Sequence, residues 1–159
     1  MMVPFAAILI PLFKIFSKLG MLNSYAAVII PTIAQVFVIF FFRQSTKSFQ
    51  KELIQAARVD GLNELQVFFY IYFPSMKSTY AAGAIIVFMT NWNSFMWPLI
   101  VLQSNDKRTM TLAISSLSSS YTPDYGVMMT AIIIATLPMV LLFFTMQKQF
   151  VEGILGSVK

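Results

Sequence analysis

Five residues between positions 90 and 97 carry side chains suited to holding a polar solute: Thr90, Asn91, Trp92, Asn93 and Trp97. Amide groups hydrogen-bond to hydroxyls, and indole rings stack on the apolar faces of sugar rings, so this mixture suits a sugar. The same residues have a second interpretation, in which the indoles anchor the chain at a membrane interface and the asparagines pair with neighbouring helices.

The rest of the chain offers little that could catalyse a reaction. The 159 residues include no cysteine and no histidine, which excludes disulfides, thiolate or imidazole metal sites, cysteine nucleophiles and histidine bases. No phosphate-binding G-x-x-x-x-G-K-S/T loop occurs, so the chain should not hydrolyse ATP. We therefore expect no catalytic residue, no metal site and no cofactor, and a protein that is not itself an enzyme.

Composition places these residues in a membrane protein. Hydrophobic residues make up 58% of the chain and charged residues only 11%, and the mean hydropathy is +0.76. Residues 19–42, 78–105 and 125–147 carry no charge at all. About 20 helical residues cross the ~30 Å hydrocarbon core of a bilayer, so each run is long enough to span it. The runs also lack the carboxylates that an intramembrane protease or an ion-coupled transporter would use.

The predicted fold is all-α, a polytopic bundle of about four transmembrane helices near residues 1–18, 25–43, 77–103 and 126–147. The first run is short for a full span, and we expect it to be the remainder of a span whose start is missing. A signal peptide is the alternative, but its positive charge should precede the apolar core, whereas Lys14 and Lys18 follow it. Pro31, Pro98 and Pro138 should mark kinks, and the serine-rich residues 115–120 should form a loop.

The positive charges suggest an orientation. One polar face would carry seven of the eleven basic residues and the other four, which places the first face in the cytoplasm. This predicts a cytoplasmic loop over 44–76, an external loop over 104–125 and a cytoplasmic tail over 148–159. The basic residues are scattered, with no Lys/Arg-rich block, so lipid headgroups are expected partners and nucleic acid is not.

The long polar insert at 48–74 should form two short helices joined by a tight turn. Ser48 is positioned to cap the first helix, which should end at Asp60 and Gly61, because glycine adopts the left-handed conformation of a helix stop without steric cost. Asn63 should cap the second helix, with Gln66 reaching back to it.

Further signals in the insert concern its apolar residues. Leu62 and Val67 have the spacing of a hydrophobic staple, and Pro74 should end the second helix just before the next span. Ala57, Gly61 and Val67 also have the spacing of a DNA-binding helix-turn-helix. A recognition helix, however, needs side chains that reach phosphates and bases, and residues 68–73 are all apolar or aromatic.

The residues Gln55-Ala56-Ala57-Arg58-Val59-Asp60-Gly61, followed by Phe68, Ile71 and Pro74, resemble the EAA loop of the membrane-spanning permease subunits of bacterial ABC importers. Three further stretches resemble the carbohydrate branch of that family, the maltose- and lactose-type permeases. They are 92–99 (WNSFMWPL), 107–112 (KRTMTL) and 153–159 (GILGSVK). The resemblance extends over nearly the whole chain.

The resemblance implies that the insert is a coupling element, which docks on a separate ATP-hydrolysing subunit and transmits its movement to the transmembrane helices. The residues carried over to this docking role are Gln55, Ala56, Ala57, Asp60, Gly61 and Phe68. The family usually has glutamate at the first motif position. Gln55 lacks the charge for a salt bridge to the ATPase, and Glu52 one turn earlier could partly substitute.

On this interpretation the chain is a permease subunit of a binding-protein-dependent importer for a sugar or oligosaccharide, located in the bacterial cell membrane. Its partners would be an ATPase dimer, a second permease and an extracytoplasmic sugar-binding protein. Asn91, Trp92, Asn93 and Trp97 would then line the substrate path. Family members usually have six spans, so we expect an N-terminally truncated sequence. Two alternatives stay open: a permease for a non-sugar solute, and an inactive or anchoring membrane subunit.

Overall fold

The computed structural model describes residues 4–119 and 123–155, and within them every regular element is a helix. The backbone divides into two compact units. The first contains Met1–Gln35 and Met89–Met139, and the second contains Val36–Phe88 and Val140–Lys159. The division falls inside two helices, α7 (Lys77–Trp92) and α10 (Tyr125–Leu155).

The first unit begins with α1 (Phe5–Lys18), which ends in a glycine stop. Gly20 has φ +65°, its N–H donates to Ser17 O at 3.1 Å, and the Met21 N–H donates to Phe16 O at 3.0 Å. These two bonds form a Schellman motif, which satisfies carbonyls that the helix end leaves without partners. The next helix, α2 (Tyr25–Ile29), is capped by Ser24, whose Oγ accepts from the Ala27 N–H.

A proline interrupts the helical path after α2, as the sequence predicted. Pro31 lies in a 3-10 turn, η1 (Ile30–Thr32), and α-helix resumes only at α3 (Val36–Lys47). A second interruption falls inside the predicted span 77–103, where α7 ends at Trp92 and α8 (Met96–Val101) begins four residues later. Pro98 lies in the first turn of α8, where its missing N–H removes no helical hydrogen bond. α10 continues as α-helix through Pro138.

The loop predicted for residues 115–120 is wrong where the structure describes it. A short 3-10 turn, η3 (Asn105–Lys107), leads into α9 (Met110–Ser118), so residues 115–118 are helical; Ser120 lies outside the described residues. The serine hydroxyls bond locally to the backbone, with Ser116 Oγ donating to Ala113 O at 2.7 Å. Buried Leu112 fixes the helix on its apolar side.

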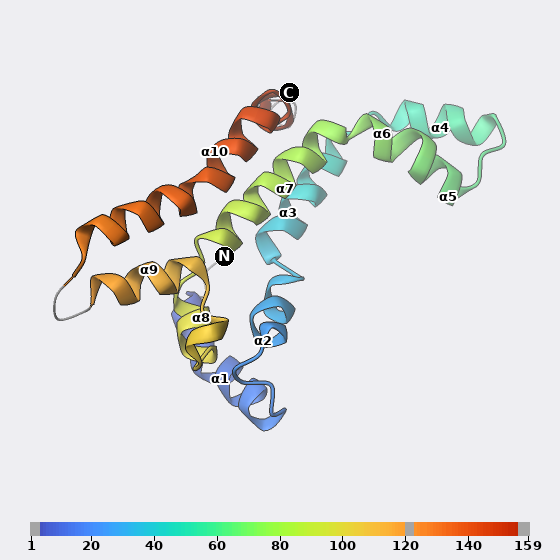
Figure 1. Ribbon diagram of the computed structural model, residues 1–159. Helices are drawn as coiled ribbons and strands as arrows, with labels where there is room; N and C mark the ends of the chain where they lie inside the picture. Colours follow the sequence, from blue (N-terminus) through green and yellow to red (C-terminus); the bar gives the residue numbers. More distant parts are fainter. Residues whose placement is uncertain (1–3, 120–122, 156–159) are drawn as a thin grey trace. The chain divides into compact units, whose positions relative to one another are not determined.

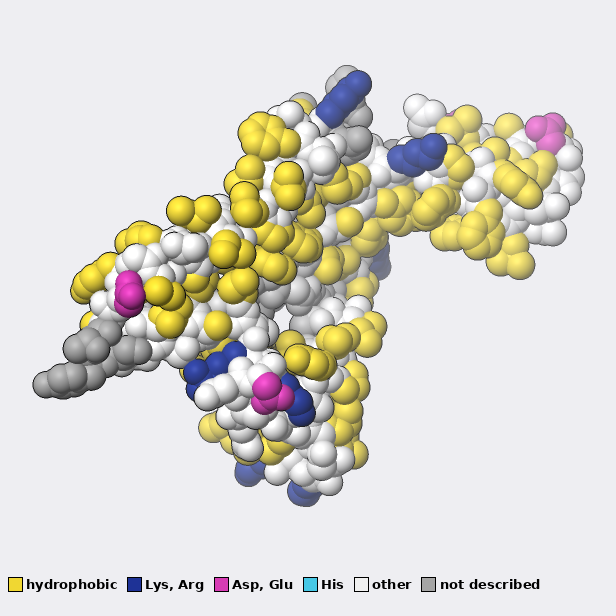
Figure 2. Space-filling view, viewed as in Figure 1, with side chains coloured by type: hydrophobic (Ala, Val, Ile, Leu, Met, Phe, Trp, Pro, Cys, Tyr) yellow, Lys and Arg dark blue, Asp and Glu magenta, His cyan; other side chains and the backbone are white. Residues whose placement is uncertain are grey.

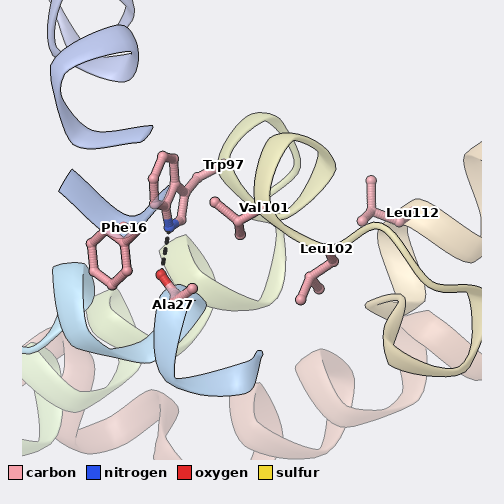
Figure 3. Close-up of a cluster of buried hydrophobic side chains, with 6 residues drawn as sticks. All are labelled: Phe16, Ala27, Trp97, Val101, Leu102 and Leu112. Carbon is pink, nitrogen blue, oxygen red and sulfur yellow. Dashed lines mark hydrogen bonds between the residues drawn. The ribbon is translucent and has the colours of Figure 1, made fainter. Parts of the chain in front are cut away.

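The core of the first unit is a cluster of six buried side chains from α1, α2, α8 and α9, shown in Figure 3: Phe16, Ala27, Trp97, Val101, Leu102 and Leu112. Trp97 is 3% exposed, and its ring meets the Phe16 ring edge-on with centroids 5.7 Å apart. The indole N–H donates to Ala27 O at 2.8 Å, so the one polar atom of this large side chain is satisfied.

The second unit contains α3, most of α7 and the insert (Figure 1). Gly83 of α7 lies against the Phe42 ring of α3, because a Cβ added to the glycine would lie only 2.8 Å from Phe42 Cζ. The insert comprises α4 (Lys51–Val59), α5 (Glu64–Gln66), the π-helical turn η2 (Val67–Tyr72) and α6 (Phe73–Ser75).

Two expected helix boundaries in the insert are wrong. The cap of α4 is Gln50, which makes no side-chain capping bond, and Ser48 Oγ instead donates to Ser45 O at 2.9 Å. Pro74 does not end the second helix, since α6 continues through it to Ser75 and the backbone turns at Met76. Pro74 falls at the start of α6, where a missing N–H is tolerated.

In the part of the chain that the structure describes, two stretches are long and apolar enough to cross a membrane, Tyr25–Lys47 and Tyr125–Lys148. Almost none of their residues is buried by the protein: 6% of the first apolar window and 0% of the second. Figure 2 likewise shows hydrophobic side chains over much of the visible surface. Such surfaces are stable only when lipid or another protein covers them.

Candidate functional site

The turn between α4 and α5 is built by the residues that the sequence singled out. Gly61 has φ +84°, its N–H donates to Arg58 O, and the Leu62 N–H donates to Ala57 O, both at 3.1 Å. This is a second Schellman motif, and it ends α4 at Val59 as predicted. The chain therefore reverses direction within four residues of the helix end.

A capping box starts the second arm, which confirms the prediction for Asn63 and Gln66. Asn63 Oδ1 accepts from the Gln66 N–H, and Gln66 Oε1 accepts from the Asn63 N–H, both at 2.9 Å. Two backbone donors that the helix start leaves without partners are thus satisfied reciprocally.

An ion pair links the two arms. Arg58 Nε lies 2.9 Å from Glu64 Oε1, and Nη2 lies 3.2 Å from Oε2, so the contact is bidentate. Both side chains are more than half exposed, and a pair of this kind contributes on the order of 0–1 kcal/mol. Its main effect is to orient the arms. We call α4, α5 and η2 together the coupling hairpin, after the role that the sequence predicts for it.

The inner face of the coupling hairpin is small and apolar. Ala57 of α4 and Val67 of η2 are each 4% exposed, and α4 packs against η2. At the base, Tyr72 packs on the rings of Phe49 and Phe68, and its hydroxyl hydrogen-bonds to Thr46 Oγ1 at the end of α3. The hairpin is thereby tied to a helix that is apolar enough to span the membrane.

The residues carried over to a docking role divide into two groups. Gln55, Ala56, Asp60 and Gly61 are exposed, and Phe68 is 41% exposed, so a partner could reach all five. Ala57 lies inside the hairpin, where it supports the packing of the two arms.

The structure adds apolar residues that the docking assignment missed. Val59 is 87% exposed, Leu65 72% and Phe69 61%. We call Ala56, Val59, Leu65 and Phe69 the hairpin patch. Its signal in the sequence was an apolar, β-branched residue three positions after Ala56, directly before the Asp-Gly stop. In Figure 2 hydrophobic side chains cover much of the hairpin, with an acidic side chain at its far end.

The substrate-path candidates lie in the first unit, at the end of α7. Asn91 Oδ1 accepts from Gln35 Nε2 at 3.3 Å, and the Trp92 indole N–H donates to Ala135 O of α10 at 3.0 Å. Asn93 Nδ2 donates to Met89 O at 2.8 Å and lies 3.6 Å from Met139 Sδ. The contacts with Gln35, Ala135 and Met139 bring together segments more than 40 positions apart in the sequence. Thr90 and Asn93 are exposed.

We call Asn91, Trp92 and Asn93 the polar group at the end of α7. Trp97 is separate from these residues. It is a core residue whose indole N–H is engaged by Ala27 O, so neither stacking on a sugar nor anchoring at an interface describes its surroundings. Among the described residues, no group of three or more acidic side chains is close enough to hold a metal ion.

Residues 1–155 match the family described as "Binding-protein-dependent transport system inner membrane component". The chain is 60% identical, over its whole length, to the lactose transport system permease protein LacG of Rhizobium radiobacter. Over the same extent it is 39% identical to the arabinooligosaccharides transport system permease protein AraQ of Bacillus subtilis, and 32% identical to the sn-glycerol-3-phosphate transport system permease protein UgpE of Escherichia coli K12. The chain spans 58% of the first relative and 57% of the other two.

Proposed function

We propose, for a chain that belongs to the family of binding-protein-dependent transport system inner membrane components, that it forms part of the membrane-spanning permease of a bacterial importer for a sugar or oligosaccharide. Two of the relatives are named as permeases for lactose and arabinooligosaccharides, which supports the choice of a carbohydrate. The chain would form the translocation path with a second permease and receive its solute from an extracytoplasmic binding protein.

The coupling hairpin is the observation that carries the proposal. A glycine stop, a capping box and a bidentate ion pair hold its two short arms, and an aromatic contact ties its base to α3. A rigid projection of this kind transmits displacement better than a mobile loop would. We propose that the hairpin lies in the cytoplasm and docks on an ATPase subunit, which supplies the energy for transport.

The hairpin patch supplies the docking surface. Val59 is a large apolar side chain with almost no cover from its own chain, and burying such a side chain against a partner contributes about 1.5–3 kcal/mol. Gln55 and Asp60 lie on the same arm and could add polar contacts at the rim. Asn91, Trp92 and Asn93 would line the solute path, whereas Trp97 would support the core around it.

The test compares two variants at Val59, in a cell that also makes the ATPase, the second permease and the binding protein. Val59→Glu should lower ATPase recovery with the affinity-purified chain at least about tenfold, because docking would then desolvate a carboxylate. Val59→Leu, which keeps an apolar side chain, should leave recovery unchanged. Uptake of radiolabelled lactose should follow recovery in both variants.

Wild-type recovery of the ATPase with Val59→Glu and with Ala56→Glu would refute docking on the hairpin patch. Ala57→Glu is a weaker test, because it would place a carboxylate inside the hairpin and disrupt the packing of α4 on η2.

A phosphorylated solute is the second candidate, favoured by the relative named for sn-glycerol-3-phosphate. An uptake assay separates the sugar from the phosphorylated solute. It measures radiolabelled lactose and sn-glycerol-3-phosphate in cells without the chain, and again in cells in which the chain is restored. Restored uptake of the phosphate alone would replace the sugar proposal, and restored uptake of neither would favour an anchoring subunit.

A further inference from the structure

A cavity of about 460 Å³ lies between α8 and α9 in the first unit, apart from the polar group at the end of α7. Its volume falls within the roughly 300–1,000 Å³ of small-molecule sites in proteins. Part of its lining is apolar and comes from Leu99, Leu102 and Leu112. Leu102 and Leu112 belong to the buried cluster, so this wall is continuous with the core (Figure 3).

The rest of the cavity lining is polar. Ser115 and Ser116 of α9, and Ser119 at its C-terminal cap, follow Leu112 at spacings of three, four and seven residues, which places all four on one side. The Ser119 hydroxyl donates to Ser116 O at 3.2 Å, which leaves its oxygen as an acceptor. Gln103 and Arg108 add amide and guanidinium donors from the loop before α9.

That loop is held in place by Asn23. Asn23 Oδ1 accepts from the backbone N–H groups of Gln103 and Ser104 at 3.1 Å each and from Ser104 Oγ at 2.9 Å. The Asn23 backbone N–H donates to Val101 O at 2.7 Å, and Asn23 O accepts from Lys107 Nζ at 2.8 Å. The wall carrying Gln103 is thus fixed without a ligand, which lowers the entropic cost of binding one.

The combination of groups indicates the kind of ligand. A sugar ring has an apolar C–H face, which suits the leucine wall, and a rim of hydroxyls that both donate and accept, which suits serine, glutamine and arginine. Arg108 makes no ion pair with the carboxylates that the structure describes, so none of these carboxylates competes with a ligand for its guanidinium. Among the described residues of the lining it is the one cation, whereas a site for a phosphate group would normally gather several.

We infer that the cavity between α8 and α9 is a sugar-binding site, separate from the path at the end of α7, which holds one ring of the solute. The choice of a sugar rests on the proposed function. Arg108 and Gln103 donate to ring hydroxyls, the serine oxygens of the lining accept from them, and the leucine wall covers one face of the ring.

The test uses a lactoside carrying a photoreactive diazirine, applied to the full chain assembled with its importer partners in lipid nanodiscs. Labelled peptides are then identified by mass spectrometry. Labelling should fall within residues 99–119 and disappear with excess lactose. Arg108→Gln should lower it at least about fivefold, and Arg108→Lys, which keeps a donor cation, should lower it less.

The matched control is Arg43→Gln, which removes a cation from α3 in the other unit and should leave labelling unchanged. Near-wild-type melting of Arg108→Gln verifies that the fold is intact. Lactose-protected labelling confined to residues 89–97 would overturn the cavity site and leave the sugar importer standing. Equal labelling of wild type and Arg108→Gln would also overturn it, and an absence of protected labelling in a complex that transports lactose would do so too.

Discussion

Single residues set the turn geometry on which the hairpin depends. Gly61 and Gly20 both have positive φ and both end a helix through a Schellman motif. Asn23, at φ 54°, is the non-glycine residue with positive φ in the described part of the chain, and it joins two loops about 80 positions apart. These conformations are costly for most side chains, so each position limits which residues it accepts.

Gly61→Ala tests this limit. A Cβ at Gly61 would meet nothing within 4 Å, so only the left-handed backbone would oppose it, at a cost of about 1 kcal/mol. Hydrogen exchange of the Leu62 amide, whose bond to Ala57 O closes the turn, should speed up about fivefold. Gly61→Asn should cost less, because asparagine tolerates this conformation better. Unchanged exchange in Gly61→Ala would mean that the glycine stop does not hold the turn.

At the scale of elements, α3 and α7 meet where Gly83 faces Phe42. The Phe42 ring also packs on Phe41 and Tyr80, with centroids 5.6 Å and 5.1 Å away, so it has little room to move. The glycine therefore sets how closely the two helices approach, and close approach at small residues is a common basis of helix packing in membranes.

Gly83→Ala should destabilise the protein by about 1–3 kcal/mol, because its Cβ would lie 2.8 Å from Phe42 Cζ. The measurement is the midpoint of unfolding by SDS in mixed micelles. In Phe42→Leu, where the ring is absent, adding Gly83→Ala should cost clearly less. Additive effects of the two substitutions would show that the contact does not control the packing.

Local signals in the sequence predicted the hairpin well, and long-range contacts are why other features could not be predicted. The Asp60-Gly61 stop and the Asn63–Gln66 box act within a few residues, so their chemistry can be recognised in a short window. The burial of Trp97 could not be predicted, because the carbonyl partner of its indole N–H, Ala27 O, lies 70 positions away in the sequence. The serine-rich residues 115–120 predict a loop, whereas residues 115–118 belong to α9, because the burial of Leu112 holds a helix there.

At the scale of the whole molecule, both units contain polar side chains within a largely apolar chain. The first unit holds the polar group at the end of α7 and the cavity between α8 and α9, and the second holds the coupling hairpin. α7 and α10 run continuously through both units. On the proposed function, these helices would connect a docking surface for the ATPase with the region that handles the solute.

The most direct test of this account is the accessibility of the hairpin patch from each side of the membrane. The chain has no native cysteine, so Val59→Cys supplies a single reactive thiol at an 87% exposed position. A membrane-impermeant maleimide should label it only from the cytoplasmic side, and assembly with the ATPase should slow labelling at least about tenfold. Asp106→Cys, in the predicted external loop, should react only from outside. Labelling of Val59→Cys from outside intact cells, or equal labelling with and without the ATPase, would contradict the coupling role of the hairpin.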